Sequence, residues 1–451
     1  MARLAMAVVV LAACGDNQAL AMCDGVEPVF ADVVPLHTIA RALPARELLL
    51  AGTFRDTVGL GDRTLTSAGG TDIFVARIAS DGRITVTTYG DAEDQELLEV
   101  AVASTGDYAI AGRFRGTIDL GGGSLAATGT SSMFVAGFRV DGTHRSSKLY
   151  PVEAILRALS ISPAGDLAIA GTNFDPIDFG GGALATGGQF LGVLDADGNY
   201  VTSRSLALED TSVNLDVGLA FDGDELVVAG SYTNSIDLGG GPLPSAGALD
   251  FYLARFARGG AHRTSRHLGG PGNDGYRGFD GDRISISPVA GGVVLASGYN
   301  GMLDLGDGPH ATVDDLDDIF VLQLDDAFAP VWNQTFTYPS FQAIGALAIA
   351  SDGTIGITGS ASGETVAGSP AACGGADASH AFATTFDPDG HVRWSRCFPA
   401  EFAAGLSAAF RGTDELVVAG TFSGVLELGT TRLASDSLSG FVAGVRPTCI
   451  K

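Results

Sequence analysis

The chain has 451 residues, and hydrophobic residues make up 46% of it, enough for one large domain or several ordinary ones. Charged residues make up only 17%, and Asp and Glu outnumber Lys and Arg by 52 to 26, which gives a formal net charge of −26. This balance argues against nucleic acid or an anionic lipid surface as a partner, because both need clustered Lys and Arg. The 64 glycines favour many turns and short strands over long helices.

The first residues have the features of an export signal. Arg3 precedes an apolar stretch, residues 4–13, that is far shorter than the ~20 residues of a membrane-spanning helix. The stretch ends in Leu11-Ala-Ala-Cys14, which resembles the lipobox of bacterial lipoproteins. That resemblance implies a signal peptide over 1–13, a lipid on Cys14 and a tether over 14–26. The alternative is an ordinary secretory signal, and either one exports the protein. We expect a lipid-anchored, extracytoplasmic protein of the cell envelope, at the outer membrane or the cell surface.

A repeat of about sixty residues runs through the rest of the chain. An apolar run that ends in a pair of small residues recurs seven times, and successive pairs are 60, 59, 59, 67, 62 and 61 residues apart. The pairs begin at Ala51, Ala111, Ala170, Ala229, Ala296, Thr358 and Ala419. A phenylalanine recurs in the same phase, at Phe74, Phe134, Phe190, Phe251, Phe320, Phe382 and Phe441. We expect the small pair to allow neighbouring sheets to pack closely, and the phenylalanine to fill the space between them.

Each repeat contains four short strand signals. In the second repeat these are residues 100–104, 107–114, 133–140 and 143–150, with a glycine-rich connection between the second and third and an Asp141-Gly142 turn between the third and fourth. Apolar runs of four to eight residues separated by Asp-Gly or Gly turns indicate antiparallel strands joined as hairpins. Four such strands, repeated seven times, are typical of the blades of a β-propeller.

The pattern resembles the seven-bladed β-propeller repeats (SBBP type) of secreted bacterial proteins. The best matches are Asp72-Ile-Phe-Val-Ala-Arg77, Asp318-Ile-Phe-Val321, the strands that contain Trp332 and Trp394, and Ala346-Leu-Ala-Ile-Ala-Ser-Asp-Gly353. Most of the repeats lack the tryptophan, and the connection between the second and third strands is longer than in the plain motif. The resemblance covers about residues 27–447 and implies a fold and a secreted protein, but no reaction.

The register of the repeats predicts how the ring closes. The last repeat has its third strand at 441–446 and no fourth strand after it, whereas residues 27–34 lie where the fourth strand of a preceding repeat would lie. Pairing of these two segments would cover an exposed strand edge. The sequence therefore predicts one all-β domain over 27–451, a seven-bladed β-propeller with four antiparallel strands per blade, closed by an N-terminal strand that completes the last blade. We expect a monomer.

Four cysteines remain after Cys14, namely Cys23, Cys373, Cys397 and Cys449. They allow three pairings, and export to an oxidising compartment favours disulfides. Cys449 follows the third strand of the last repeat and Cys23 precedes the strand that would complete it, so this register predicts a Cys23–Cys449 disulfide. Cys373 and Cys397 flank one hairpin of the sixth repeat and form the other predicted pair. The alternative, metal or redox chemistry, has no Cys-x-x-Cys motif to support it.

No catalytic residue can be assigned from the sequence. The chain has no His-Glu-x-x-His, Gly-x-Ser-x-Gly or Ser-x-x-Lys motif, and its seven histidines are scattered over different strands and turns. We expect no cofactor. One metal hypothesis is Ca²⁺ at a dense group of carboxylates, since hard cations bind oxygen ligands. This group consists of Asp314, Asp315, Asp317 and Asp318.

The longest connections between strands are predicted to share one face of the ring. These are residues 117–132, 238–250, 269–283 and 305–318. We therefore expect a non-enzymatic binding or scaffolding module that presents this loop-rich face to a protein or glycan and contacts the membrane through its lipid only. The alternative is an enzyme, such as a lyase or hydrolase, at the loop-rich mouth. An enzyme predicts a funnel of convergent His, Arg or carboxylate side chains with perturbed pKa values, and a scaffold predicts a broad face without them.

Overall fold

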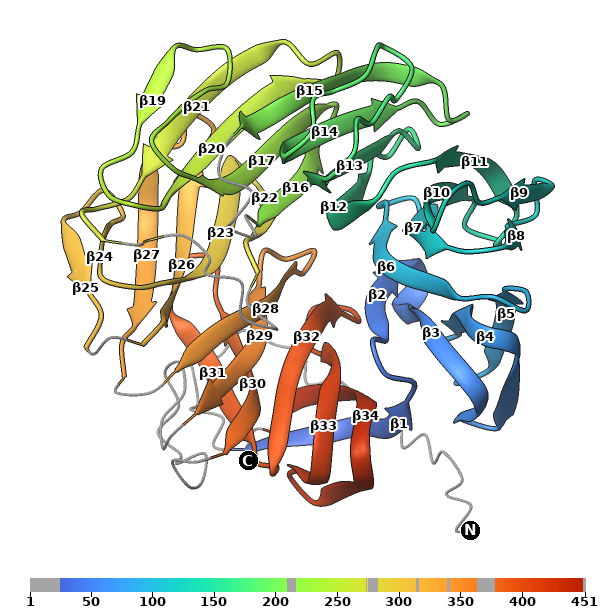
Figure 1. Cartoon of the computed structure of the whole chain (residues 1–451). Helices are drawn as coiled ribbons and strands as arrows, with labels where there is room; N and C mark the ends of the chain where they lie inside the picture. The colour runs from blue at the N-terminus through green and yellow to red at the C-terminus, as the bar shows by residue number, and fades with distance from the viewer. Residues whose placement is uncertain are drawn as a thin grey trace.

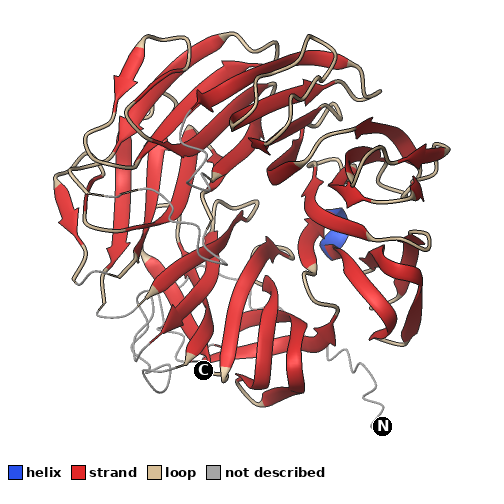
Figure 2. Cartoon of the chain, in the orientation of Figure 1, coloured by secondary structure: helices blue, strands red, loops and turns tan. Residues whose placement is uncertain are grey.

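The structure, a computed structural model, describes residues 25–208, 216–272, 274, 283–313, 316–338, 341–362 and 378–448. Over these ranges the chain is all-β, and the one helical element is a short 3-10 helix, η1 (Pro44–Arg46) (Figure 2). The sheets follow one another around a centre in chain order, a propeller-like arrangement (Figure 1). No helix in the described part of the chain is long and apolar enough to cross a membrane.

Five separate four-stranded antiparallel sheets form the first five units within the described ranges. Unit one consists of β2 (Ile39–Leu43), β3 (Glu47–Leu60), β4 (Arg63–Ile78) and β5 (Ile84–Tyr89). Unit two consists of β6 (Gln95–Val102), β7 (Tyr108–Phe114), β10 (Ser132–Phe138) and β11 (His144–Tyr150). Unit three consists of β12 (Ala154–Ile161), β13 (Leu167–Asn173), β14 (Gly188–Leu194) and β15 (Tyr200–Leu208). Unit four consists of β16 (Val217–Asp222), β17 (Glu225–Tyr232), β20 (Asp250–Ala257) and β21 (His262–Leu268), and unit five of β22 (Ser285–Val289), β23 (Gly292–Tyr299), β26 (Asp318–Asp325) and β27 (Pro330–Phe336).

The last eight strands form two further four-stranded units. Unit six consists of β28 (Gln342–Ile349), β29 (Ile355–Ser362), β30 (Ser379–Phe386) and β31 (Val392–Phe398). Unit seven consists of β32 (Phe402–Phe410), β33 (Leu416–Leu428), β34 (Thr431–Thr448) and β1 (Gly25–Val34). A single parallel bridge, Ser379 to Phe402, joins the two units into one eight-stranded sheet.

The N-terminal strand lies where the repeat register predicts it. β1 pairs antiparallel with β34, so that Gly25 is opposite Thr448 and Val34 is opposite Gly440 (Figure 1). The two segments come from opposite ends of the described chain, and their pairing gives unit seven its fourth strand. This strand covers the edge of β34 that would otherwise present unpaired backbone groups to solvent.

The recurring small pair has a role that was not expected from the sequence. In four units the innermost strand has a β-bulge opposite the pair, for example between Leu97 and Glu99 opposite Gly112 and Ala111. A Cβ on Gly112 would lie 2.0 Å from the carbonyl oxygen of Glu96 and 2.9 Å from the ring of Phe134. The glycine therefore accommodates the bulge of its own sheet. The alanine of the pair is buried between sheets, since Ala51 of unit one lies in the core cluster shared with unit two.

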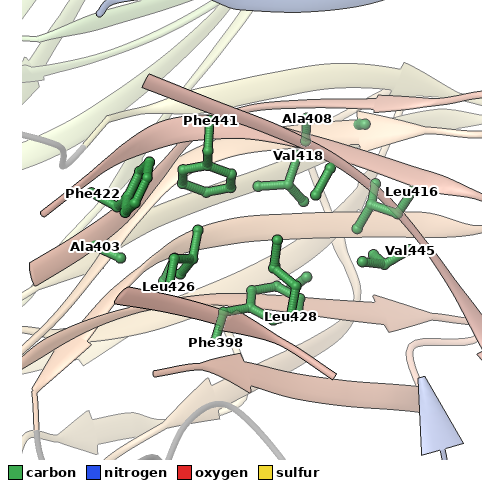
Figure 3. Packing of buried hydrophobic residues seen from close by; sticks show 14 of the residues in the cluster. Phe398, Ala403, Ala408, Leu416, Val418, Phe422, Leu426, Leu428, Phe441 and Val445 are labelled. Carbon is green, nitrogen blue, oxygen red and sulfur yellow. The ribbon is translucent and has the colours of Figure 1, made fainter. Parts of the chain in front are cut away.

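The recurring phenylalanines do fill the space between consecutive units. Phe134 of unit two is fully buried and belongs to one core cluster with Leu49, Ala51 and Ile73 of unit one. Figure 3 shows the corresponding cluster between units six and seven, where Phe441 is buried together with Phe398 and other residues of unit six. The core is thus a series of layers between neighbouring sheets, and removing a sheet would expose the apolar faces of the two beside it.

The long connections between second and third strands are not free loops. Within the described residues they contain three small two-stranded sheets, made of β8 (Thr117–Asp119) and β9 (Ser124–Ala126), β18 (Ser235–Asp237) and β19 (Pro242–Pro244), and β24 (Met302–Asp304) and β25 (Pro309–Ala311). In unit two, Ile118 and Leu120 are buried in the core cluster shared with unit one, and Asp119 accepts hydrogen bonds from the N–H groups of Gly121 and Gly123 at the hairpin tip. These hairpins insert between neighbouring units. This placement corrects the expectation that the whole of each connection lies on a ligand-binding face.

Candidate functional site

The first strand of each unit lies innermost in the propeller-like arrangement (Figure 1). These innermost strands, β2, β6, β12, β16, β22, β28 and β32, line a central cavity of about 600 Å³ together with the residues that precede them. Each innermost strand contacts the next one around the ring, and β32 contacts β2. Most of the lining is apolar or small, so the few ionisable side chains on the wall define the chemistry of the cavity.

Five ionisable side chains from five units form a connected group, here called the ionic cluster. They are Arg41, Glu99, Arg157, Asp216 and Arg283. The longest connection is made by Arg283, which immediately precedes the innermost strand of unit five. Its Nη1 donates to Oε1 of Glu99 in unit two over 2.5 Å and to the carbonyl oxygen of Arg157 in unit three over 3.3 Å. This side chain therefore ties its own unit to two others on the cavity wall.

The two ends of the ionic cluster are held by backbone groups and by one hydroxyl. Arg41 donates from Nε to the carbonyl oxygen of Val100 over 3.0 Å and from Nη1 to Oγ of Ser407 over 2.9 Å. Asp216 accepts from the N–H of Ile284 over 2.7 Å, and its Oδ1 lies 3.7 Å from Nε of Arg157. These contacts hold the charged groups in defined positions before any ligand enters.

Burial and mutual charge perturb two members of the ionic cluster. Burial lowers the pKa of Arg41, the carboxylate of Glu99 counteracts this, and the like charge of Arg283 lowers that pKa further. Burial raises the pKa of Asp216, and the guanidinium groups of Arg157 and Arg283 offset part of that rise. Both shifts follow from taking charges out of water, and the opposite charges beside them offset part of each shift.

The exposure of the ionic cluster indicates what it can do. The side chain of Glu99 is only 8% exposed, whereas that of Arg283 is 40% exposed and lines the cavity. A guanidinium presents several N–H donors in a planar fork that suits carboxylate, phosphate or polar oxygen groups. The arrangement is therefore suited to binding such a polar group.

The predicted disulfides fall mostly outside the described residues. Cys14, Cys23, Cys373 and Cys449 all lie there, so the lipidation of Cys14 and both cysteine pairings stay predictions. Cys397 is described. It lies on β31, the fourth strand of unit six, opposite Phe382, and it is disulfide-bonded.

The predicted calcium ligands are only partly described. Asp314 and Asp315 lie outside the described residues, and Asp317 and Asp318 lie at the start of β26. Oδ1 of Asp318 accepts from the N–H of Tyr338 over 3.2 Å and from Nε2 of Gln342 over 3.4 Å. The described part of the chain contains no group of three or more His, Cys, Asp or Glu side chains that could hold a metal ion. Calcium binding at the four aspartates stays a prediction.

Sequence reasoning did not identify the ionic cluster. Its members carry no motif, because they come from separate repeats and meet only when the ring forms. A signal was nevertheless present in the repeat register: Arg157 lies at the bulge of its first strand, where units two, six and seven have Leu98, Gly345 and Leu406. Aligning the seven first strands would have shown that charged residues interrupt a surface lined by apolar ones.

Comparisons with known proteins add little beyond the fold. No family model matches the chain, and no curated protein matches it. Among solved structures, it is similar to BamB from Moraxella catarrhalis, at 12% identity over 91% of this chain and 100% of that chain, with a TM-score of 0.39. It is also similar to the β-propeller domain of the Trilobed protease from Pyrococcus furiosus, at 9% identity over 92% and 97% of the two chains, with a TM-score of 0.45. A third likeness is to a catalytically inactive virginiamycin B lyase from Staphylococcus aureus with quinupristin, at 10% identity over 92% and 99%, with a TM-score of 0.39. Likenesses at this level say nothing about what the chain binds or catalyses.

Proposed function

We propose that the chain is a lipid-anchored, extracytoplasmic binding module that takes a protein or glycan partner at the mouth of its central cavity. In this proposal residues 1–13 are the signal peptide, 14–26 the tether and 27–451 a closed seven-bladed β-propeller. The partner contacts the end of the cavity where the innermost strands begin, and the membrane is contacted only by the lipid on Cys14.

Two observations support seven blades in a closed ring. The innermost strands contact one another in order from β2 to β32, and β32 also contacts β2. The chain ends of the described structure are joined in unit seven by the pairing of β1 with β34. A ring of this kind leaves no unpaired neighbour for any sheet, which is the way propellers protect their apolar faces.

The same register supports the predicted anchor and disulfide. Gly25 is paired with Thr448, and Cys23 and Cys449 follow these two residues outward along the chain by two positions and one position. The innermost strand of each unit begins at the cavity mouth, and the third strand runs in the same direction. β34, the third strand of unit seven, therefore runs away from the cavity mouth. A tether that leaves from Gly25 therefore starts on the opposite side of the ring and points the mouth away from the membrane.

One observation carries the proposed binding site: the contact of Arg283 with Glu99 and Arg157, which brings three units together at an open cavity. A purely structural ring has no need of a partly exposed guanidinium on the wall of its central cavity. The site combines rigid placement on strands with an accessible donor group, the combination that small polar binding sites use.

The test compares two arginine variants of the mature protein in capture experiments. One is Arg283→Met, at the cavity, and the matched control is Arg432→Met, which removes an exposed ion pair to Glu427 away from the cavity lining. Immobilised protein is incubated with envelope extracts and with an array of neutral and acidic glycans. We expect a partner that the wild type and Arg432→Met retain and Arg283→Met loses at least tenfold in affinity. Equal capture by all three proteins contradicts a site at the cavity mouth.

The second candidate function, a lyase or hydrolase, is favoured by one feature of the ionic cluster. Titratable groups from several units converge on a cavity, and the pKa of Asp216 is raised by burial, which is the arrangement that the sequence analysis associated with an enzyme. If the chain is an enzyme, it should turn over the glycan or peptide that it captures. Glu99→Gln should then abolish turnover without abolishing capture. Capture without turnover leaves the binding module as the function.

A further inference from the structure

Two buried carboxyl groups meet at the junction between units four and five. Asp250 begins β20, and Asp274 lies in the connection that leads to unit five; both residues are 0% exposed. Oδ2 of Asp250 accepts from the N–H of Ala246 over 2.5 Å and lies 3.2 Å from Nε2 of His267. Oδ2 of Asp274 accepts from the N–H of Gly270. Each carboxyl group is thus held through one oxygen.

The second oxygen of each carboxyl group is buried without a hydrogen-bond partner among the described residues. These atoms are Oδ1 of Asp250 and Oδ1 of Asp274. A buried carboxylate oxygen without a donor is costly, and two carboxylates side by side also repel each other. Burial is the largest cause that raises the pKa of Asp274, Asp250 raises it further and His267 lowers it, which places that pKa at about 7.

The repeats show what normally occupies this position. At the junction of units one and two, the N–H of Asp91 donates to Oε1 of the buried Gln95 over 2.9 Å, the same contact that Gly270 makes with Asp274. At the junction of units five and six, Nε2 of the buried Gln342 donates to Oδ1 of Asp318 over 3.4 Å. At this second junction an amide thus donates to the buried aspartate, whereas Nε2 of Gln95 donates to Asp91 and to the carbonyl oxygen of Arg115. At the junction of units four and five a carboxyl group replaces the amide, and only its protonated form has a donor to offer.

One imidazole and two phenol groups also face the pair. His267 of β21 is in contact with Asp250, and the phenol groups of Tyr232 on β17 and Tyr299 on β23 face the pair from the adjoining strands. Burial and the nearby carboxylates raise the pKa of both tyrosines, so they stay neutral. Asp318 acts on Tyr299 as a further negative charge.

The backbone of the connection packs closely against the pair. A Cβ on Gly269 would lie 2.2 Å from Oδ1 of Asp250, and a Cβ on Gly270 would lie 1.8 Å from the carbonyl oxygen of Met302. Asp274 also donates its N–H to the carbonyl oxygen of Leu249 over 2.7 Å. A proton shared by the two carboxyl groups adds no heavy atom to this packing.

We propose that Asp250 and Asp274 form a proton-binding site, in which the protonated carboxyl group of Asp274 donates its O–H to Oδ1 of Asp250 and so fastens the backbone at Asp274 to unit four. Release of this proton leaves two facing carboxylates and weakens this attachment. The site is a pH-sensitive contact between units four and five, and it goes beyond the proposed binding function and does not depend on it.

The sign of the pH effect follows from proton linkage. The folded protein holds the proton on Asp274 up to about pH 7, whereas the unfolded chain releases it near its ordinary pKa of 3.8. The contribution to stability is therefore complete below about pH 4 and is lost as the pH rises to about 7. It is isolated by subtracting the pH profile of Asp274→Asn, since this variant keeps an amide donor and cannot titrate.

The test uses the mature full-length protein and infrared difference spectroscopy between pH 5 and pH 9. We expect one protonated-carboxyl band that disappears with a midpoint near neutrality, is absent in Asp274→Asn and is retained in the exposed control Asp436→Asn. His267→Gln should raise the midpoint, because the imidazole favours the ionised form of Asp274. The melting temperature of the wild type should fall relative to Asp274→Asn over the same pH range.

Three outcomes overturn the proposal. One is a wild type without a titrating carboxyl band, and another is a band that persists in Asp274→Asn. The third is a rise in melting temperature on adding millimolar calcium that Asp274→Asn abolishes, because this assigns a cation to the pair instead of a proton. If Asp274→Asn does not fold, the wild-type band and its shift in His267→Gln decide the question.

Discussion

The hydroxyl of Ser407 bridges both backbone groups of Ala40. It donates to the carbonyl oxygen over 2.9 Å and accepts from the N–H over 3.1 Å, although the two residues are 367 positions apart in the sequence. They lie on the innermost strands of units seven and one. Ser160 plays a related part between units three and four, where its Oγ accepts from the N–H of Phe221 over 2.9 Å. Side-chain hydroxyls thus satisfy backbone groups at the inner edges where separate sheets meet.

Replacing Ser407 with alanine should destabilise the junction of units seven and one. Ala40 is fully buried, so its N–H would lose the hydroxyl and its C=O would keep only the donor of Arg41, at a cost of about 2 kcal/mol in the free energy of unfolding. Urea denaturation of Ser407→Ala and of the exposed control Ser437→Ala measures this. A change in Ser407→Ala no larger than in the control would show that the hydroxyl is dispensable for closing the ring.

A second prediction follows from the bulge opposite the small pair. Gly112→Ala places a methyl group against the carbonyl oxygen of Glu96 and the ring of Phe134, and should cost about 2 kcal/mol or more. Gly59→Ala on β3 is the matched control, since no atom lies within 4 Å of its added Cβ. Thermal unfolding of both variants should show a large loss for the first and almost none for the second. Equal losses would mean that the bulge relaxes to admit a side chain.

These glycines also show how much of the fold can be predicted from the sequence. The repeat of Ala-Gly pairs predicted where the second strands lie, and the buried phenylalanines were predicted to fill the space between sheets. The bulge that demands Gly112 was not predicted, because it arises from the way a curved inner strand meets its neighbour. The two-stranded hairpins were not predicted for a similar reason. In the sequence Ile118 and Leu120 lie within a polar, glycine-rich connection, and only the fold shows that they pack against the neighbouring sheet.

The ionic cluster was beyond prediction for a different reason. Arg283 and Glu99 are 184 positions apart and lie three units from one another along the chain. Nothing in either repeat marks the other as its partner, and the contact exists only because the ring brings their innermost strands to one cavity. The repeat therefore predicted the arrangement of the sheets. The candidate binding site lies at residues that depart from the repeat.

Removing the guanidinium of Arg283 should destabilise the fold more than removing a surface ion pair. Arg283→Met leaves the largely buried carboxylate of Glu99 without its partner and should cost about 1–3 kcal/mol, a range reduced for the partial exposure of Arg283. Arg113→Met breaks a pair whose side chains are 53% and 39% exposed, and should cost less than about 1 kcal/mol. Adding Glu99→Gln to Arg283→Met should recover part of the loss. A double variant no more stable than Arg283→Met would mean that the pair does not couple.

The disulfide pattern provides the test of the register at the chain ends. Gly25 opposite Thr448 sets the spacing of the segments that carry Cys23 and Cys449, and Cys397 on β31 is the described member of the other predicted pair. Peptide mapping without reduction should yield Cys23 linked to Cys449 and Cys373 linked to Cys397. The first bond closes a loop of most of the chain, so its removal in Cys23→Ser should lower the free energy of unfolding by about 3–5 kcal/mol. A link between Cys23 and either Cys373 or Cys397 would contradict the pairing, because neither belongs to the unit that β1 completes.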